Sequence, residues 1–124
     1  MLPSDIEAHR YIGDIYEELT KALSFVEGMS LEEFLEDNRS FYAAKMAVQN
    51  AIEASIQLNS AKKNKGQFER LFPDFDYNKL RLEANLGRHD YRESSPFIFW
   101  NDLHGVLTDL RNAAEKILTA KRTK

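Results

Sequence analysis

A group of polar and ionisable side chains in the second half of the sequence has the types that phosphodiester cleavage requires. It consists of Asn85, Arg88, His89, Tyr91 and Arg92, shortly before a Ser-Ser-Pro turn. A histidine titrates near neutral pH and can act as a general acid or base. An arginine presents a fork of donors that matches phosphate, and a tyrosine hydroxyl can orient a substrate. These residues predict either a metal-free cleavage site or, as composition alone would favour, a solvated helix end followed by a charged loop.

Other kinds of site find little support in the sequence. There are no cysteines, which excludes disulfides, thiolate nucleophiles and cysteine-ligated zinc. A phosphate-binding glycine loop, the HExxH and GxSxG motifs and metal-ligand spacing are also missing, so we expect no metal and no cofactor. Of the other histidines, His9 has charged neighbours and is predicted to be exposed, whereas His104 follows Leu103 and is predicted to take a packed or edge position.

Size and charge indicate one small domain. The 124 residues predict a single unit over residues 1–124, and the net charge of −3 argues against nonspecific coating of nucleic acid. Any contact with RNA should therefore be local. The sequence shows neither a targeting segment nor an apolar run near the ~20 residues of a membrane span, which suits a cytoplasmic protein.

The elements that must position the polar group are all predicted to be helices. Capping boxes begin at Ser4 and at Ser30, Gly28 ends the first helix, and Asp76 is a candidate cap. The predicted helices are the one between Ser4 and Gly28, a short one after Ser30, and those over about residues 41–60, 77–86 and 96–120.

These helices predict an all-α, up-and-down bundle of four main helices plus a short one. The first, third and last long helices should pack together. One face of the third helix should carry Tyr42, Met46, Ala47, Ile52, Ser55 and Ile56. The side chains expected to be buried are Leu19, Leu23, Ile52, Leu103, Val106 and Leu110.

Three segments in order resemble the HepT-like branch of the HEPN superfamily. They are Gly28-Met-Ser-Leu-Glu-Glu-Phe-Leu-Glu36, Pro73-Asp-Phe-Asp-Tyr77 and His89-Asp-Tyr91, followed by a helix that opens near Trp100. The resemblance covers roughly residues 10 to 118. It departs from the family at Ala84, where the best-studied members place an arginine, so this chain reads Asn-x-x-Arg-His-x-Tyr.

The resemblance implies a metal-independent ribonuclease that acts as the toxin of a toxin–antitoxin pair. His89 would be the general acid or base, Arg88 would stabilise the phosphate charge with Arg92, and Asn85 and Tyr91 would hold the phosphate or orient the histidine. Arg81, one turn before the alanine, is a candidate to supply the missing charge. In the family, two protomers join their motifs in a cleft, and the partner nucleotidyltransferase adds AMP to the tyrosine, here Tyr91.

Two alternatives remain open at this point. The chain could be a non-catalytic substrate-binding or regulatory subunit of a partner nucleotidyltransferase, which Ala84 favours, or a purely structural helical interaction protein. A homodimer is expected in addition, because Phe97, Phe99 and Trp100 leave apolar surface to cover.

Overall fold

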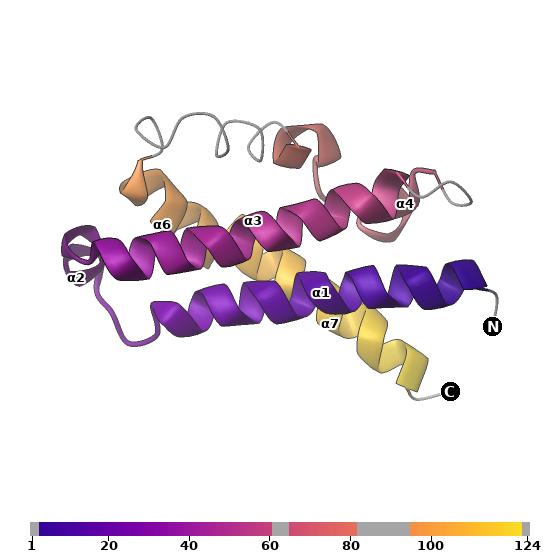
Figure 1. The fold of residues 1–124 in the computed structure, drawn as a ribbon, viewed down its shortest axis with the longest axis horizontal. Helices are drawn as coiled ribbons and strands as arrows, with labels where there is room; N and C mark the ends of the chain where they lie inside the picture. Colours follow the sequence, from indigo (N-terminus) through magenta and orange to yellow (C-terminus); the bar gives the residue numbers. More distant parts are fainter. Residues whose placement is uncertain (1–2, 61–64, 82–94, 123–124) are drawn as a thin grey trace.

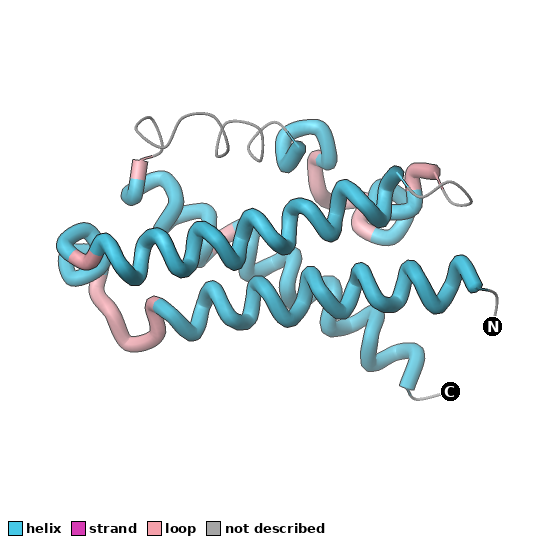
Figure 2. The backbone as a smooth tube through the Cα atoms, in the orientation of Figure 1, coloured by secondary structure: helices cyan, strands magenta, loops and turns pink. Residues whose placement is uncertain are grey.

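A computed structural model of the chain describes residues 3–60, 65–81 and 95–122. Within these ranges the protein is helical and contains no strand, which confirms the predicted all-α class. Residues 77–81 form a further helical stretch. The helices are α1 (Pro3–Phe25), α2 (Leu31–Glu36), α3 (Asn38–Ser60), α4 (Gln67–Leu71), α6 (Pro96–His104) and α7 (Val106–Arg122) (Figures 1 and 2).

Helix α1 is the element around which the bundle is built. It runs antiparallel to α3 along most of its length, and α7 crosses it on another side (Figure 1). Ile15 and Leu19 of α1 are completely buried, and α3, which packs against α1, contributes alanines such as Ala44 and Ala51 that have no exposed surface. These small side chains let the two backbones approach closely. The predicted packing is confirmed for the two helix pairs that include α1.

The connection from α1 to α3 is fixed by turn and cap residues. Gly28 has a φ of +78°, a left-handed conformation that glycine adopts without steric cost. Ser30 then caps α2: its hydroxyl accepts from the Glu33 backbone N–H at 3.1 Å, and its own N–H donates to the Glu33 carboxylate at 3.0 Å. The predicted second capping box is thus confirmed. The first is wrong, because α1 already begins at Pro3, before Ser4.

The predicted last helix is in fact two helices. The helix is interrupted at Gly105. A residue with a Cβ atom at this position would place that atom 3.0 Å from the backbone oxygen of Asn101. The break shifts the apolar register by one residue, so Leu107 is 3% exposed whereas Val106 is 43% exposed. The prediction that Val106 is buried was therefore wrong.

The other buried positions were mostly predicted correctly. Leu19, Ile52, Leu103 and Leu110 are buried, and Leu23 is half-buried against the core.

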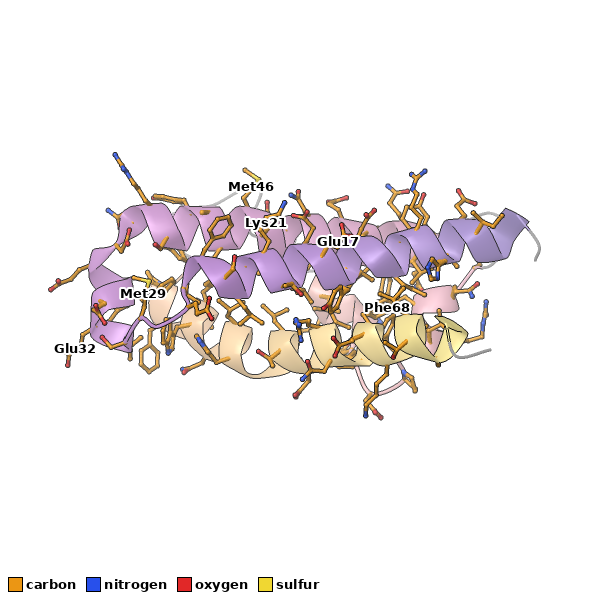
Figure 3. The ribbon with its side chains drawn as sticks, turned by 90° about the horizontal axis from the view of Figure 1, so that it is seen from below. Glu17, Lys21, Met29, Glu32, Met46 and Phe68 are labelled. Carbon is orange, nitrogen blue, oxygen red and sulfur yellow. The ribbon has the colours of Figure 1, made fainter. Side chains whose placement is uncertain are left out.

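The predicted inner face of α3 needs correction at its N-terminal end. Tyr42 and Met46 are exposed, and Phe41 and Val48 lie in the core in their place. Met46 points away from the bundle (Figure 3). Because α3 is rich in alanine, more than one face is apolar enough to be buried, and the large Phe41 ring decides which one is.

In the described ranges, no helix has the length and apolar character needed to cross a membrane.

Candidate functional site

The residues predicted to carry the chemistry lie almost entirely outside the described part of the chain. Asn85, Arg88, His89, Tyr91 and Arg92 all fall within residues 82–94. Their roles therefore stay predictions. Arg81 is the one predicted site residue that the structure describes. It is the last described residue of the helical stretch 77–81, and its side chain is exposed.

The chain is firmly anchored just before that segment. Asp76 caps the helical stretch, as predicted: its carboxylate accepts from the Lys79 N–H at 3.1 Å, and its carbonyl accepts from the Leu80 N–H at 3.1 Å. Tyr77 is buried with its ring centroid 5.7 Å from that of Phe68. Phe68 lies in the interior (Figure 3). Exposed Arg81 thus follows directly on a buried, capped turn.

The chain is anchored again just after the segment. The Ser95 hydroxyl accepts from the Ile98 N–H at 3.3 Å and caps α6, and Pro96 occupies the first helical turn, where its missing N–H costs nothing. Phe99 then stacks on Phe34 with centroids 6.3 Å apart and an interplanar angle of 14°. The predicted catalytic segment is therefore joined at both ends to packed helical structure.

Four aromatic rings from three helices form a cluster between α2, α3 and α6. Phe34 lies at its centre, 5.8 Å from Phe41, 6.3 Å from Phe99 and 5.0 Å from Trp100 between ring centroids. Phe41 and Phe99 meet edge to face at 5.5 Å. Such contacts favour defined ring orientations. The cluster fixes α6, which follows the predicted catalytic segment in the sequence.

His104 takes the edge position that the sequence predicted. Its exposed ring lies 4.2 Å from that of Trp100 between centroids, and its Nδ1 lies 2.9 Å from the Trp100 carbonyl oxygen. A carbonyl oxygen only accepts, so Nδ1 is the donor in this contact and Nε2 is not engaged by it.

The prediction that His9 is exposed was wrong. It is half-buried, and its Nδ1 is buried with no hydrogen-bond partner in the described ranges.

A buried lysine on α3 was missed at the sequence level. Lys45 is buried, its ammonium lies 5.6 Å from the centroid of the Phe41 ring, and removal from water lowers its pKa. The signal was its place in the helical repeat, one turn after Phe41 and one turn before Val48 and Gln49. A lysine in such a register is a candidate for function, because burial of a charge is costly.

Two of the acidic side chains around α2 are held in their charged form by hydrogen bonds. The backbone and side chain of Ser30 lower the pKa of Glu33, and those of Ser40 lower the pKa of Asp37. Both carboxylates therefore stay negative to lower pH than free carboxyl groups do.

Arg111 holds two helices together. Arg111 of α7 donates to the Thr20 hydroxyl at 2.8 Å and to the Tyr16 hydroxyl at 3.3 Å, both on α1. It also lies over the Tyr16 ring at 4.9 Å. We assign it a structural role, which leaves Arg81 as an exposed cation beside the predicted site.

Among the described residues, no three histidine, aspartate or glutamate side chains gather in a way that would hold a metal ion.

The chain was compared with known proteins and families. The family model described as Ribonuclease HepT-like matches residues 15–117. None of the curated proteins and none of the solved structures matches the chain.

Proposed function

Because the chain belongs to the family of HepT-like ribonucleases, we propose that it is a metal-independent endoribonuclease that acts in the cytoplasm as the toxin of a toxin–antitoxin pair. The observation that carries this proposal is the span of the match, residues 15–117. That span includes the Asn-x-x-Arg-His-x-Tyr motif at residues 85–91.

The reaction proposed is an internal transesterification of RNA. The ribose 2′ oxygen attacks the adjacent phosphorus, the bond from phosphorus to the 5′ oxygen breaks, and a proton moves from the 2′-hydroxyl to the leaving oxygen. His89 serves as general base or acid for that proton. Arg88 and Arg92 stabilise the charge that develops on the phosphate, while Asn85 and Tyr91 orient the phosphate or the imidazole.

Arg81 is the proposed source of the charge that Ala84 does not provide. It lies one helical turn before Ala84 in the sequence, and its side chain is exposed at the end of the anchored stretch 77–81. Arginine at this place suits phosphate because its donors pair with two oxygens at once.

Ala84 also supports a second candidate function. A chain without the family's arginine could bind substrate or regulate a partner nucleotidyltransferase without cutting RNA. Growth arrest on expression, abolished by His89→Ala, supports the ribonuclease, whereas arrest or binding that survives this change supports the second function.

The partners proposed are a second copy of the chain and a minimal nucleotidyltransferase as antitoxin. Eight large apolar side chains of the described residues are at least 41% exposed, which leaves surface for protein contacts. AMP transferred to the Tyr91 hydroxyl would place a bulky, negatively charged group where RNA phosphate is to bind.

Cleavage of RNA by the purified chain in the presence of a chelator tests the ribonuclease. His89→Ala should lower the rate by about two to four orders of magnitude, the usual weight of general acid–base catalysis. Arg88→Ala should also impair it severely, whereas Arg39→Ala, a change at an exposed arginine on α3, is the matched control. An unimpaired His89 variant would place the chemistry elsewhere.

Two further measurements test the partners. Light scattering at micromolar concentration should report a dimer, and a monomer would contradict the composite cleft. Mass spectrometry after co-expression with the nucleotidyltransferase should show additions of AMP that disappear in Tyr91→Phe. Neutralisation of the toxin without added mass would instead mean that the antitoxin acts by binding alone.

A further inference from the structure

A row of rings leads from the core to the surface along α6. Phe34 is 1% exposed, Trp100 is half-buried and His104 is exposed. The centroids are 5.0 Å apart for Phe34 and Trp100 and 4.2 Å apart for Trp100 and His104. Within the described residues the row ends at the imidazole, whose exposed surface is therefore open to a further ring.

Two other side chains lie on the same side of α6. Phe97, Asn101 and His104 are spaced by four and three residues, which places them in line on one helical face. Phe97 is 51% exposed, and Asn101 is exposed as well. At 1.5 Å per residue, Phe97 and His104 lie about 10 Å apart along the helix axis. This face thus alternates exposed rings with groups that form hydrogen bonds.

The hydrogen-bonding capacity of the face is already oriented. The His104 Nδ1 donates to the Trp100 carbonyl oxygen at 2.9 Å, which leaves Nε2 of the exposed ring for a hydrogen bond to a ligand. The side-chain amide of Asn101 provides both a donor and an acceptor. Nucleobase edges present the same mixture of donors and acceptors.

We propose that this face, the α6 platform (Phe97, Trp100, Asn101 and His104), binds unpaired bases of RNA. Bases of single-stranded RNA stack on aromatic and imidazole rings, while amide and imidazole groups bind their edges. The proposal rests on the proposed ribonuclease function and assigns it a place where substrate is held. Six residues lead from Tyr91 to Phe97, and six residues span at most about 21 Å, which is a few nucleotides of extended RNA.

Two properties of the platform favour a base over a protein partner or a phosphate. The exposed large apolar side chains of α6 are Phe97 at 51% and Ile98 at 60%, which together expose on the order of 200 Å², whereas a stable protein interface takes about 800 Å² from each partner. The neighbouring α2 carries the charged Glu33, and charged Asp37 follows at its C-terminal end. Carboxylates do not bind phosphate, so we expect the platform to contact the bases and cations elsewhere to contact the backbone.

Trp100 reports directly on such binding, because it is the only tryptophan of the chain. The probe is a 2′-O-methyl oligoadenylate of about six nucleotides, which cannot be cleaved through its 2′ oxygen. It should quench the fluorescence of the full-length protein. His104→Ala and Phe97→Leu should each weaken binding about 5- to 150-fold, the usual weight of one stacking ring. Phe97→Tyr, which keeps a ring, should bind as the wild type does.

The controls distinguish stacking on the platform from nonspecific binding to apolar surface and from electrostatic contacts with phosphate. Met46→Ala removes an exposed apolar side chain from α3 and should leave binding unchanged. The dependence of binding on salt should be the same in His104→Ala as in the wild type, because no phosphate contact is lost. Far-UV circular dichroism checks that each variant is folded.

Three results would overturn the platform. They are wild-type affinity in folded Phe97→Leu, a salt dependence reduced by about one charge in His104→Ala, or loss of a dimer in Phe97→Leu with binding intact. Cleavage of RNA without quenching by the probe would refute the platform and leave the ribonuclease proposal standing. Binding to the platform without cleavage of any RNA would refute the ribonuclease proposal instead.

Discussion

Replacement of Phe34 by alanine should be among the most damaging single changes in this protein. Phe34 is the only fully buried side chain of the short helix α2, and its ring contacts Phe41, Phe99 and Trp100. A helix of six residues has too few internal hydrogen bonds to persist without such an anchor. Loss of Phe34 therefore releases α2 and one wall of the cluster that holds α6.

The expected magnitude follows from the burial of that ring. Removal of a buried phenylalanine side chain costs about 3–5 kcal/mol, through lost transfer free energy and the cavity left behind. At about 4 °C per kcal/mol for a domain of this size, the melting temperature should fall on the order of 12–20 °C. Leu35→Ala, at the adjacent residue of the same helix, should change the free energy of unfolding by less than about 0.5 kcal/mol, because Leu35 is 44% exposed.

Urea unfolding followed by far-UV circular dichroism gives both free energies, and Trp100 fluorescence provides a second probe because its ring lies 5.0 Å from that of Phe34. The slope of the free energy of unfolding against urea concentration should be unchanged if the substitution alters stability alone. Equal costs for Phe34→Ala and Leu35→Ala would show that α2 is not anchored through the aromatic cluster.

Further predictions concern the helix break and the cap. Leu107→Ala should lower the free energy of unfolding, measured with denaturant, by about 2–5 kcal/mol, and Val106→Ala should lower it by less than about 0.5 kcal/mol. The reverse order would support the continuous last helix that the sequence predicted. Gly105→Ala should cost about 1 kcal/mol or more, because its Cβ atom crowds a backbone oxygen, and an unchanged melting temperature would contradict this crowding. Ser30→Ala should cost about 1 kcal/mol through loss of the cap. Since the folded state lowers the pKa of Glu33, its contribution to stability should be complete at neutral pH and disappear as the pH falls through the carboxyl range; a melting temperature that declines equally in Glu33→Gln would refute this.

Much of the fold could be predicted from the spacing of apolar residues and from helix-capping residues. The repeat of Ile12 and Leu19 specifies the buried face of α1, and Ser30 with Glu33 specifies where α2 begins, because both patterns are local.

The break at Gly105 could not be predicted in the same way. A glycine is tolerated inside a helix, and both Val106 and Leu107 are apolar, so the sequence fits either register. Only the packing of α6 against α2 and of α7 against α1 decides between them.

The candidate site was predicted from residue types, and its residues from 85 to 92 remain a prediction. His89 drew attention because a histidine among arginines has an obvious chemistry. Lys45 did not, since its burial beside the Phe41 ring exists only in the folded helix; His104 was predicted as a packed or edge residue, but without its contact to the Trp100 carbonyl. Contacts across one helical turn are visible in a sequence only when the buried face is known.

The central place of α1 has a consequence for how the chain folds as it is synthesised. The hairpin of α1 and α3 joins segments that are close in the sequence, and it can form as soon as α3 is made. The remaining face of α1 is covered by α7, whose Glu115 meets Tyr16 across 99 residues of chain. Until α7 emerges from the ribosome, an apolar stripe of the nascent hairpin faces water and is open to chaperones or to other nascent chains. Completion of the fold therefore awaits the last described helix, and slow synthesis of the intervening residues should lengthen that exposed interval.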